Sequence, residues 1–202
     1  MTVEKNVEIQ EDLEVSQKRM TWIVSSKDIK QKEIDEALRN ALNLDKNTKL
    51  TDNTIIAQAR KSQNWNEQDR NVAFVNFYYK FSKGVVQKGY ILAIRGKQFI
   101  PGTAVMEPKD KPAEVVIDPF AHISKIFPAQ ETDEEDEPWY HSERKLIVTM
   151  AKLWELNKIK EGKVLLVSEG PICSSCKNII SEFKNQYPNI KQFEIRENIK
   201  ET

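Results

Sequence analysis

Both cysteines of the chain and one of its two histidines lie between residues 141 and 176, as His141, Cys173 and Cys176. A neutral imidazole and two thiolates suit Zn²⁺, and three protein ligands leave a coordination position for water. Glu143 follows the histidine by two residues and can move protons between that water and a substrate nitrogen. The sequence therefore predicts a hydrolytic metal centre with Glu143 as its catalytic acid and base.

The elements around these residues can bring them together. The cysteines are three positions apart, so on a helix both sulfurs face one side, and the apolar run 163–167 before them predicts a buried strand. His141 precedes a second helical pattern, in which apolar residues recur at Leu146, Ile147, Met150, Leu153 and Trp154. Unpaired N–H groups at a helix start favour thiolates. We therefore expect two helix N-termini to converge on one ion.

These motifs resemble a known signature. His141-Ser142-Glu143 and the run 171–176, PICSSC, resemble the H-x-E and P-C-x-x-C motifs of zinc nucleobase deaminases, with Ile172 inserted after the proline. The whole pattern is most similar to the bacterial toxin-type deaminases of the cytidine deaminase superfamily, which are related to the AID/APOBEC and DYW groups. The resemblance covers residues 50–197. It implies an α/β fold, a three-layer α/β/α sandwich with a mixed sheet of four to five strands.

The resemblance also implies a reaction and a setting. We expect zinc-dependent deamination of cytosine to uracil in nucleic acid. Single strands are preferred because flipping a base out of a duplex costs a few kcal/mol, and DNA is preferred over RNA because similar-looking relatives include DNA mutators. Duplex DNA, RNA and free cytidine nucleotides are the alternatives. Relatives of this type often form the toxic part of larger secreted proteins, act in the cytoplasm and are neutralised by an immunity protein.

Several residues are candidates for contacting substrate. Trp139 and Tyr140 could stack on a base, although Trp139 could instead pack under the helix start. Asn76, and with it Asn71, could bond a nucleotide sugar, as the family often has an asparagine nearby. The loop before the first cysteine adds the last candidates, which are Ser168, Glu169 and Pro171. For His122 a surface position is favoured over a substrate contact.

The rest of the chain predicts one catalytic domain, residues 50–202, preceded by a helical extension, residues 1–49, that serves as a brace, a docking arm or the tail of a delivery module. Helical spacing begins near residue 29 and again near residue 52, the runs 71–81 and 85–95 predict a hairpin, and 190–196 predicts a final strand. A proline-marked loop follows residue 96, and residues 131–137 hold six carboxylates. Such a run is typical of a solvated loop.

Overall charge and hydropathy limit the possible functions. The 31 basic and 31 acidic side chains cancel, which disfavours avid nonspecific binding of phosphate backbones. No apolar run predicts a membrane span, and the N-terminus does not resemble a signal peptide. Two cysteines three apart favour a metal or a reducing compartment over a disulfide framework.

Two other interpretations of the motifs remain open. A fourth ligand such as His122 could close a structural zinc site in a binding module, but such a site has no need of Glu143. A strand followed by C-x-x-C at a helix start is also typical of thioredoxin-like redox proteins. Only 26 residues follow Cys176, however, which is too few for the elements expected downstream in that fold.

Overall fold

The computed structural model of the chain describes residues 20–25, 28–62, 65, 69–95, 141–153 and 156–197. The predicted loop after residue 96, His122, the acidic run, Trp139 and Tyr140 lie outside these residues. In chain order the elements are β1 (Met20–Ser25), α2 (Gln31–Ala41), α3 (Asp52–Ser62), β2 (Val72–Phe81), a 3₁₀ turn (Ser82–Gly84), β3 (Val86–Ile94), α4 (Ser142–Leu153), a 3₁₀ turn (Leu156–Lys158), β4 (Ile159–Ser168), α5 (Ser174–Gln186) and β5 (Ile190–Arg196).

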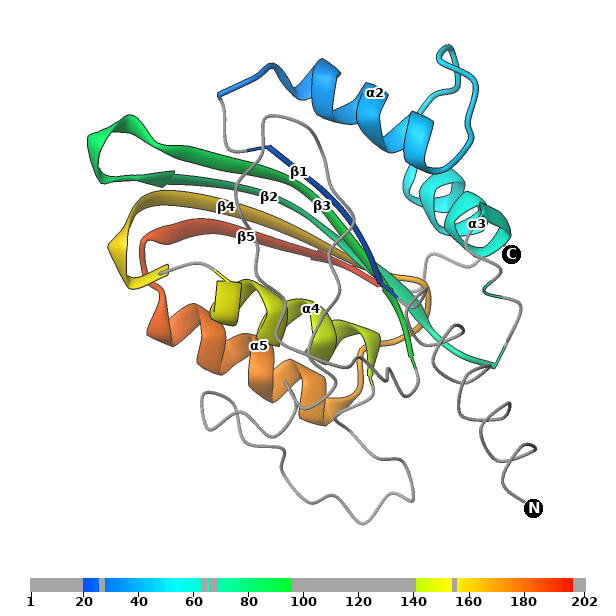
Figure 1. Ribbon diagram of the computed structural model, residues 1–202. Helices are drawn as coiled ribbons and strands as arrows, with labels where there is room; N and C mark the ends of the chain where they lie inside the picture. The colour runs from blue at the N-terminus through cyan, green and yellow to red at the C-terminus, as the bar shows by residue number, and fades with distance from the viewer. Residues whose placement is uncertain are drawn as a thin grey trace, which may run out of the picture.

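The five strands form one mixed sheet in the order β1-β3-β2-β4-β5 (Figure 1). β4 and β5 are parallel and joined through α5, and the other three pairings are antiparallel. The predicted hairpin is the β2–β3 pair, and the predicted final strand is β5 over the same residues. The α/β fold with a mixed sheet is therefore confirmed.

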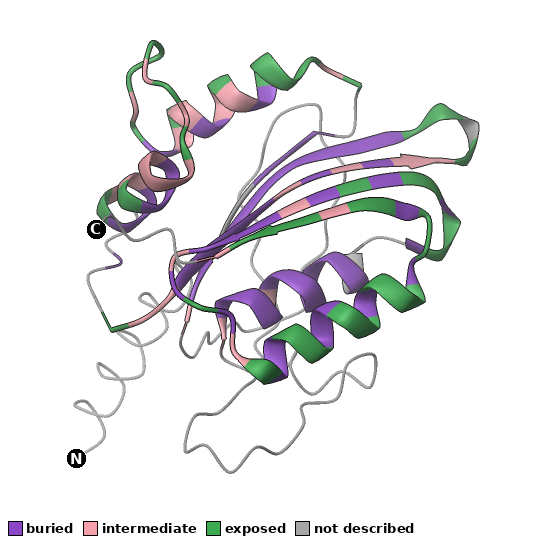
Figure 2. Cartoon of the chain, turned by 180° about the vertical axis from the view of Figure 1, so that it is seen from behind, coloured by how far each residue is buried: buried purple, intermediate pink, exposed green. Residues whose placement is uncertain are grey.

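Alternation along β2 divides the core into two layers. Ala73, Val75 and Phe77 join the cluster that contains the buried residues of α4 and α5. Val72 and Phe74 point to the opposite face and join the cluster under α2 and α3. Helices thus cover both faces of the sheet, and Figure 2 shows α4 mostly buried while α5 is buried on one side only. The metal-ligand motifs adjoin α4 and α5, so the chemistry belongs to that face.

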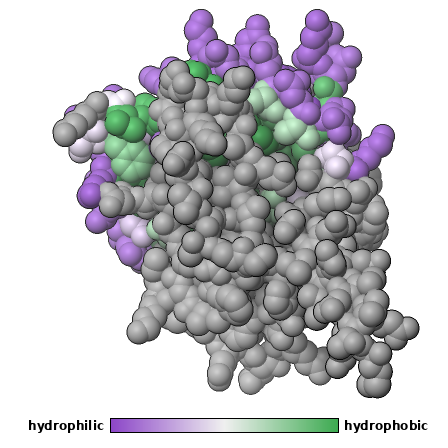
Figure 3. Space-filling model, in the orientation of Figure 1, coloured by the Kyte–Doolittle hydropathy of each residue, from purple (hydrophilic) through white to green (hydrophobic). Residues whose placement is uncertain are grey.

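The described part of residues 1–49 contributes to the same sheet and core. β1 pairs with β3 along its whole length, from Met20 opposite Ala93 to Ser25 opposite Lys88. Ile34 and Leu38 of α2 are fully buried in the cluster shared with α3. The outward face of α2 carries the hydrophilic side chains at the top of Figure 3. Packing is therefore continuous across the predicted boundary at residue 50.

Both site helices start at the same end of the sheet. α5 begins six residues after β4 ends at Ser168, and Ser168 lies opposite Ala73 near the start of β2. Among the described helices, none has the length and apolarity needed to cross a membrane.

Candidate active site

His141, Cys173 and Cys176 come together in space. The Nδ1 atom of His141 lies 3.2 Å from the Sγ of Cys173 and 3.4 Å from the Sγ of Cys176, and the three atoms lie within 4.8 Å of one another. Tetrahedral Zn²⁺ with ordinary bond lengths separates nitrogen and sulfur ligands by about 3.6 Å. The spacing and the soft donor set therefore fit a zinc ion.

Helix starts position these ligands. Cys173 is the N-cap of α5 and its carbonyl accepts the N–H of Lys177 at 3.0 Å, while Cys176 lies in the first turn. The carbonyl of His141 likewise accepts the N–H of Lys145 at 3.1 Å, one turn into α4. Both helices begin where the sequence predicted. Their partial positive charge favours thiolates at the ends that face the site.

The two thiols lie close enough to shift each other's pKa in opposite directions. A hydrogen bond from Cys176 is the main cause that lowers the pKa of the Cys173 thiol to about 3, with further bonds from His141 and Ser175. The same bond and burial raise the pKa of the Cys176 thiol. A divalent cation held between the sulfurs would replace the proton of this hydrogen bond, because metal binding to thiolates releases protons.

Glu143 is buried in the first turn of α4, with 4% of its surface exposed. Its Oε1 accepts hydrogen bonds from the Nδ2 of Asn71 at 2.7 Å and the Oγ of Ser168 at 2.8 Å, and its Oε2 accepts the Oγ of Ser142 at 3.1 Å. Burial raises the pKa of Glu143, against the lowering effect of its own backbone amide, Ser168 and Ser142. Such a carboxyl group suits proton transfer near neutral pH.

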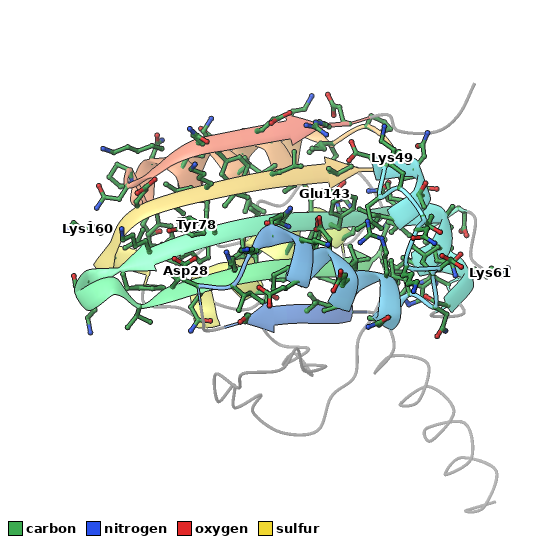
Figure 4. All side chains as sticks on the ribbon, turned by 90° about the horizontal axis from the view of Figure 1, so that it is seen from above. Asp28, Lys49, Lys61, Tyr78, Glu143 and Lys160 are labelled. Carbon is green, nitrogen blue, oxygen red and sulfur yellow. The ribbon has the colours of Figure 1, made fainter. Side chains whose placement is uncertain are left out.

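Glu143 and the metal ligands form one site. The carboxylate is close enough to Cys176 to raise the pKa of that thiol. Figure 4 shows Glu143 well separated along the strands from Lys160, which lies near the start of β4. The chemistry therefore lies toward the end of the sheet where β2 starts and β4 ends.

Asn71 has a contact that the sequence did not predict. Its Nδ2 lies within hydrogen-bond distance of Glu143, of the Oγ of Ser168 at 2.9 Å and of the Oγ of Ser142 at 3.1 Å. Its Oδ1 accepts the N–H of Gly170 at 2.8 Å. One amide thus connects the start of β2, the first turn of α4 and the loop before α5. Nothing in the local sequence signals this contact.

Of the other predicted site residues, some lie beside Glu143 and some do not. Ser168 belongs to the Glu143 cluster, and Pro171 is exposed in the loop before α5. The carboxylate of Glu169 is paired with Arg60. Asn76 lies mid-strand on β2, five residues from Asn71, and by alternation shares the face of Phe74. The structure therefore does not bring Asn76 to the face that holds the metal ligands.

Replacing Asn71 with aspartate should slow turnover by about 10- to 100-fold with metal content unchanged, the range for residues that orient a metal site from outside it. The substitution keeps the shape but places a carboxylate where Glu143 now accepts a hydrogen bond. Steady-state rates and metal analysis on the same preparation would check this. Asn40→Asp, on the exposed surface of α2, is the control, and equal turnover of both variants would contradict the role.

An α/β sandwich with a histidine and two cysteines at two helix starts, beside a buried glutamate, defines a deaminase of the cytidine deaminase-like class. Residues 107–198 match the model of the toxin deaminases, described as the BURPS668_1122 family of deaminases, so this segment is similar to that family. The matched segment contains His141, Glu143, Cys173 and Cys176. Neither the curated proteins nor the solved structures include a match to the chain.

Proposed function

We propose that this deaminase is zinc-dependent and converts cytosine to uracil in nucleic acid, with single-stranded DNA as its preferred substrate. The observation that carries the proposal is the buried Glu143 carboxylate, held by Asn71 and Ser168 and two residues from the imidazole that faces both cysteine sulfurs. A metal centre that only supported the fold would not require a buried acid in this position.

A bound zinc ion would supply a water whose pKa is lowered toward neutrality. Glu143 then accepts a proton from the attacking water and delivers it to the ring N3 of cytosine. A C4–O bond forms, the C4–N4 bond breaks, and ammonia leaves with a proton that the same carboxylate passes on. Asn71 and Ser168 keep Oε1 in place through both transfers. The products are uracil and ammonia, with one water consumed.

Two arguments support a single-stranded polynucleotide. A deaminase must have its base out of the stack, and a single strand avoids the few kcal/mol that flipping from a duplex costs. The matched family is one of toxin deaminases, and a toxin that mutates a polynucleotide damages the cell directly. Zero formal net charge is a weaker electrostatic footprint than nonspecific binders carry, so a free nucleotide is the main competing substrate.

The biological proposal follows the same family description. We infer that the chain acts in the cytoplasm of a target cell as the toxic part of a larger secreted protein, and that a dedicated immunity protein neutralises it. The chain would be copurified from cells that also express the products of adjacent genes, and any complex would be assayed for deaminase activity. This would test whether an immunity protein inhibits the enzyme. A complex of full activity would contradict this part of the proposal.

One incubation series tests the substrate. The enzyme is given single-stranded DNA, duplex DNA, single-stranded RNA, and free cytidine and its nucleotides, followed by sequencing of the polymers and chromatography of the small molecules. We expect C-to-U conversion to be fastest in single-stranded DNA. Conversion confined to duplex DNA, RNA or free nucleotides would refute single-stranded DNA as the substrate. Conversion of adenine instead of cytosine would refute cytosine as the target base.

A further inference from the structure

Arg60, near the end of α3, is buried on the face of the sheet opposite α4. Its guanidinium pairs with the carboxylate of Glu169, through Nε to Oε1 at 3.1 Å and through Nη2 to Oε2, and the two side chains are only 10% and 13% exposed. Nη2 also donates to the carbonyl of Arg70 at 2.6 Å, and Nη1 donates to the carbonyl of Trp65 at 3.2 Å. This one side chain therefore bonds two backbone carbonyls and one carboxylate, at residues 65, 70 and 169.

Two of the residues that Arg60 bonds are sequence neighbours of the residues that donate hydrogen bonds to Glu143. Glu169 directly follows Ser168, and Arg70 directly precedes Asn71. Ser168 and Asn71 both donate to Oε1 of Glu143. Arg60 thus bonds the sequence neighbour of each donor.

Backbone contacts join these two parts of the chain. The N–H of Glu169 donates to the carbonyl of Val72 at 2.9 Å, and the N–H of Val72 lies 3.3 Å from Oε2 of Glu169. The Glu169 carboxylate is therefore shared between Arg60 and the start of β2. A shift of Arg60 would be transmitted to both sides of the Glu143 cluster.

We propose that Arg60 is a positioning residue for the Glu143 carboxylate, acting through Glu169 and Arg70. A planar guanidinium fixes several acceptors in one geometry, which the point charge of a lysine cannot reproduce. A buried ion pair gives little net stability compared with apolar replacements of similar volume, so stability alone does not account for this pair. The expected effect of Arg60 on turnover rests on the proposed deaminase function. Its expected effect on the order of residues 168–170 and 70–72 does not.

Two variants separate positioning from simple support of the fold. Arg60→Lys retains a positive charge beside Glu169 but loses the planar guanidinium that bonds several acceptors at once. The double variant Arg60→Met with Glu169→Gln removes both charges, leaves no unpaired ion, and serves if the lysine variant fails to fold. Arg39→Lys is the matched control, because Arg39 on α2 donates from Nε to the carbonyl of Thr48 at 2.8 Å in the same helical layer.

Amide hydrogen exchange, metal content, kcat and KM would be measured on all four proteins, wild type included. We expect both Arg60 variants to exchange faster at residues 168–170 and 70–72, and kcat to fall by about 10-fold or more because small misplacements of reacting groups are costly. KM and zinc content should stay within about twofold of wild type, as expected when only transition-state contacts are lost. Arg39→Lys should match wild type throughout.

Unchanged exchange and kcat in folded Arg60 variants would overturn the proposal. A loss of zinc in proportion to the loss of kcat would also overturn it, and so would a rise in KM at constant kcat. Neither result follows from a displaced Glu143. If wild type deaminates none of the substrates, the proposed function fails, and faster exchange at the two stretches still decides whether Arg60 orders them.

Discussion

Replacing Glu143 with glutamine should abolish deamination and leave metal content and thermal stability close to those of wild type. Glutamine keeps an oxygen to accept from Asn71 and Ser168, but it cannot take up and release a proton. General acid and base catalysis typically contributes about 10²- to 10⁴-fold, so the rate should fall at least that far. The measurement is product formation, with zinc analysis and thermal unfolding on the same sample.

Glu182→Gln is the matched control, because Glu182 lies on the exposed side of α5. It makes the same chemical change away from the buried cluster and should retain full activity. A Glu143→Gln enzyme that keeps more than about a tenth of wild-type activity would exclude Glu143 as the proton carrier. A Glu143→Gln enzyme that loses activity together with its zinc would show that the substitution disturbs the metal site rather than proton transfer.

Replacing Cys176 with serine should remove the metal and the activity together. Cys176 is the most deeply buried of the two thiols, and a serine hydroxyl is neither a thiolate nor a soft donor. We expect zinc content after gel filtration to fall from about one ion per chain to near zero, with a lower thermal midpoint because metal binding is linked to folding. Ser181→Ala, on the exposed face of α5, controls for a change on the same helix.

Wild type that carries no stoichiometric zinc would contradict the metal centre itself. If it instead gained a Cys173–Cys176 disulfide on mild oxidation and reduced a test disulfide, the thioredoxin-like interpretation of the cysteine pair would replace ours. Zinc retained by the Cys176 variant at full stoichiometry would show that other residues hold the ion.

The metal ligands and Glu143 could be predicted because their chemistry is contained in two short motifs. Helix starts at His141 and Cys173 follow from local spacing and apolar periodicity, and β5 from a run bounded by Pro188 and the chain's last residues. Each of these signals is local. The motifs therefore predict which side chains come together, while the family resemblance predicts the layered α/β arrangement.

The contacts that orient Glu143 were beyond a single sequence. Asn71 and Glu143 are 72 positions apart, and Arg60 and Glu169 are 109 apart. The position of Glu169 in the motif loop predicts a substrate contact, while nothing in the local sequence signals the pairing of its carboxylate with Arg60. Asn76 and Asn71 could not be told apart, because a strand alternates faces and the sequence does not say which face holds the metal.

The sequence predicts a separate N-terminal extension because the family resemblance covers only residues 50–197. Its apolar residues Ile23, Ile34 and Leu38 are nevertheless buried in the cluster that also contains residues of β2 and β3 such as Phe74 and Leu92. The apolar run 20–24 predicts a short strand, but its place beside β3 follows from this burial rather than from any motif.

The turn Ser82–Gly84 joins β2 and β3 at the end of the hairpin remote from Asn71, and β2 alone spans about 33 Å. Ser82, Gly84 and Val85 are exposed. Exposed turns of this kind tolerate inserted sequence. A fluorescent reporter or a carrier protein grafted there would leave the catalytic end of the molecule unobstructed, so the enzyme can be tracked or tethered without blocking access to its substrate.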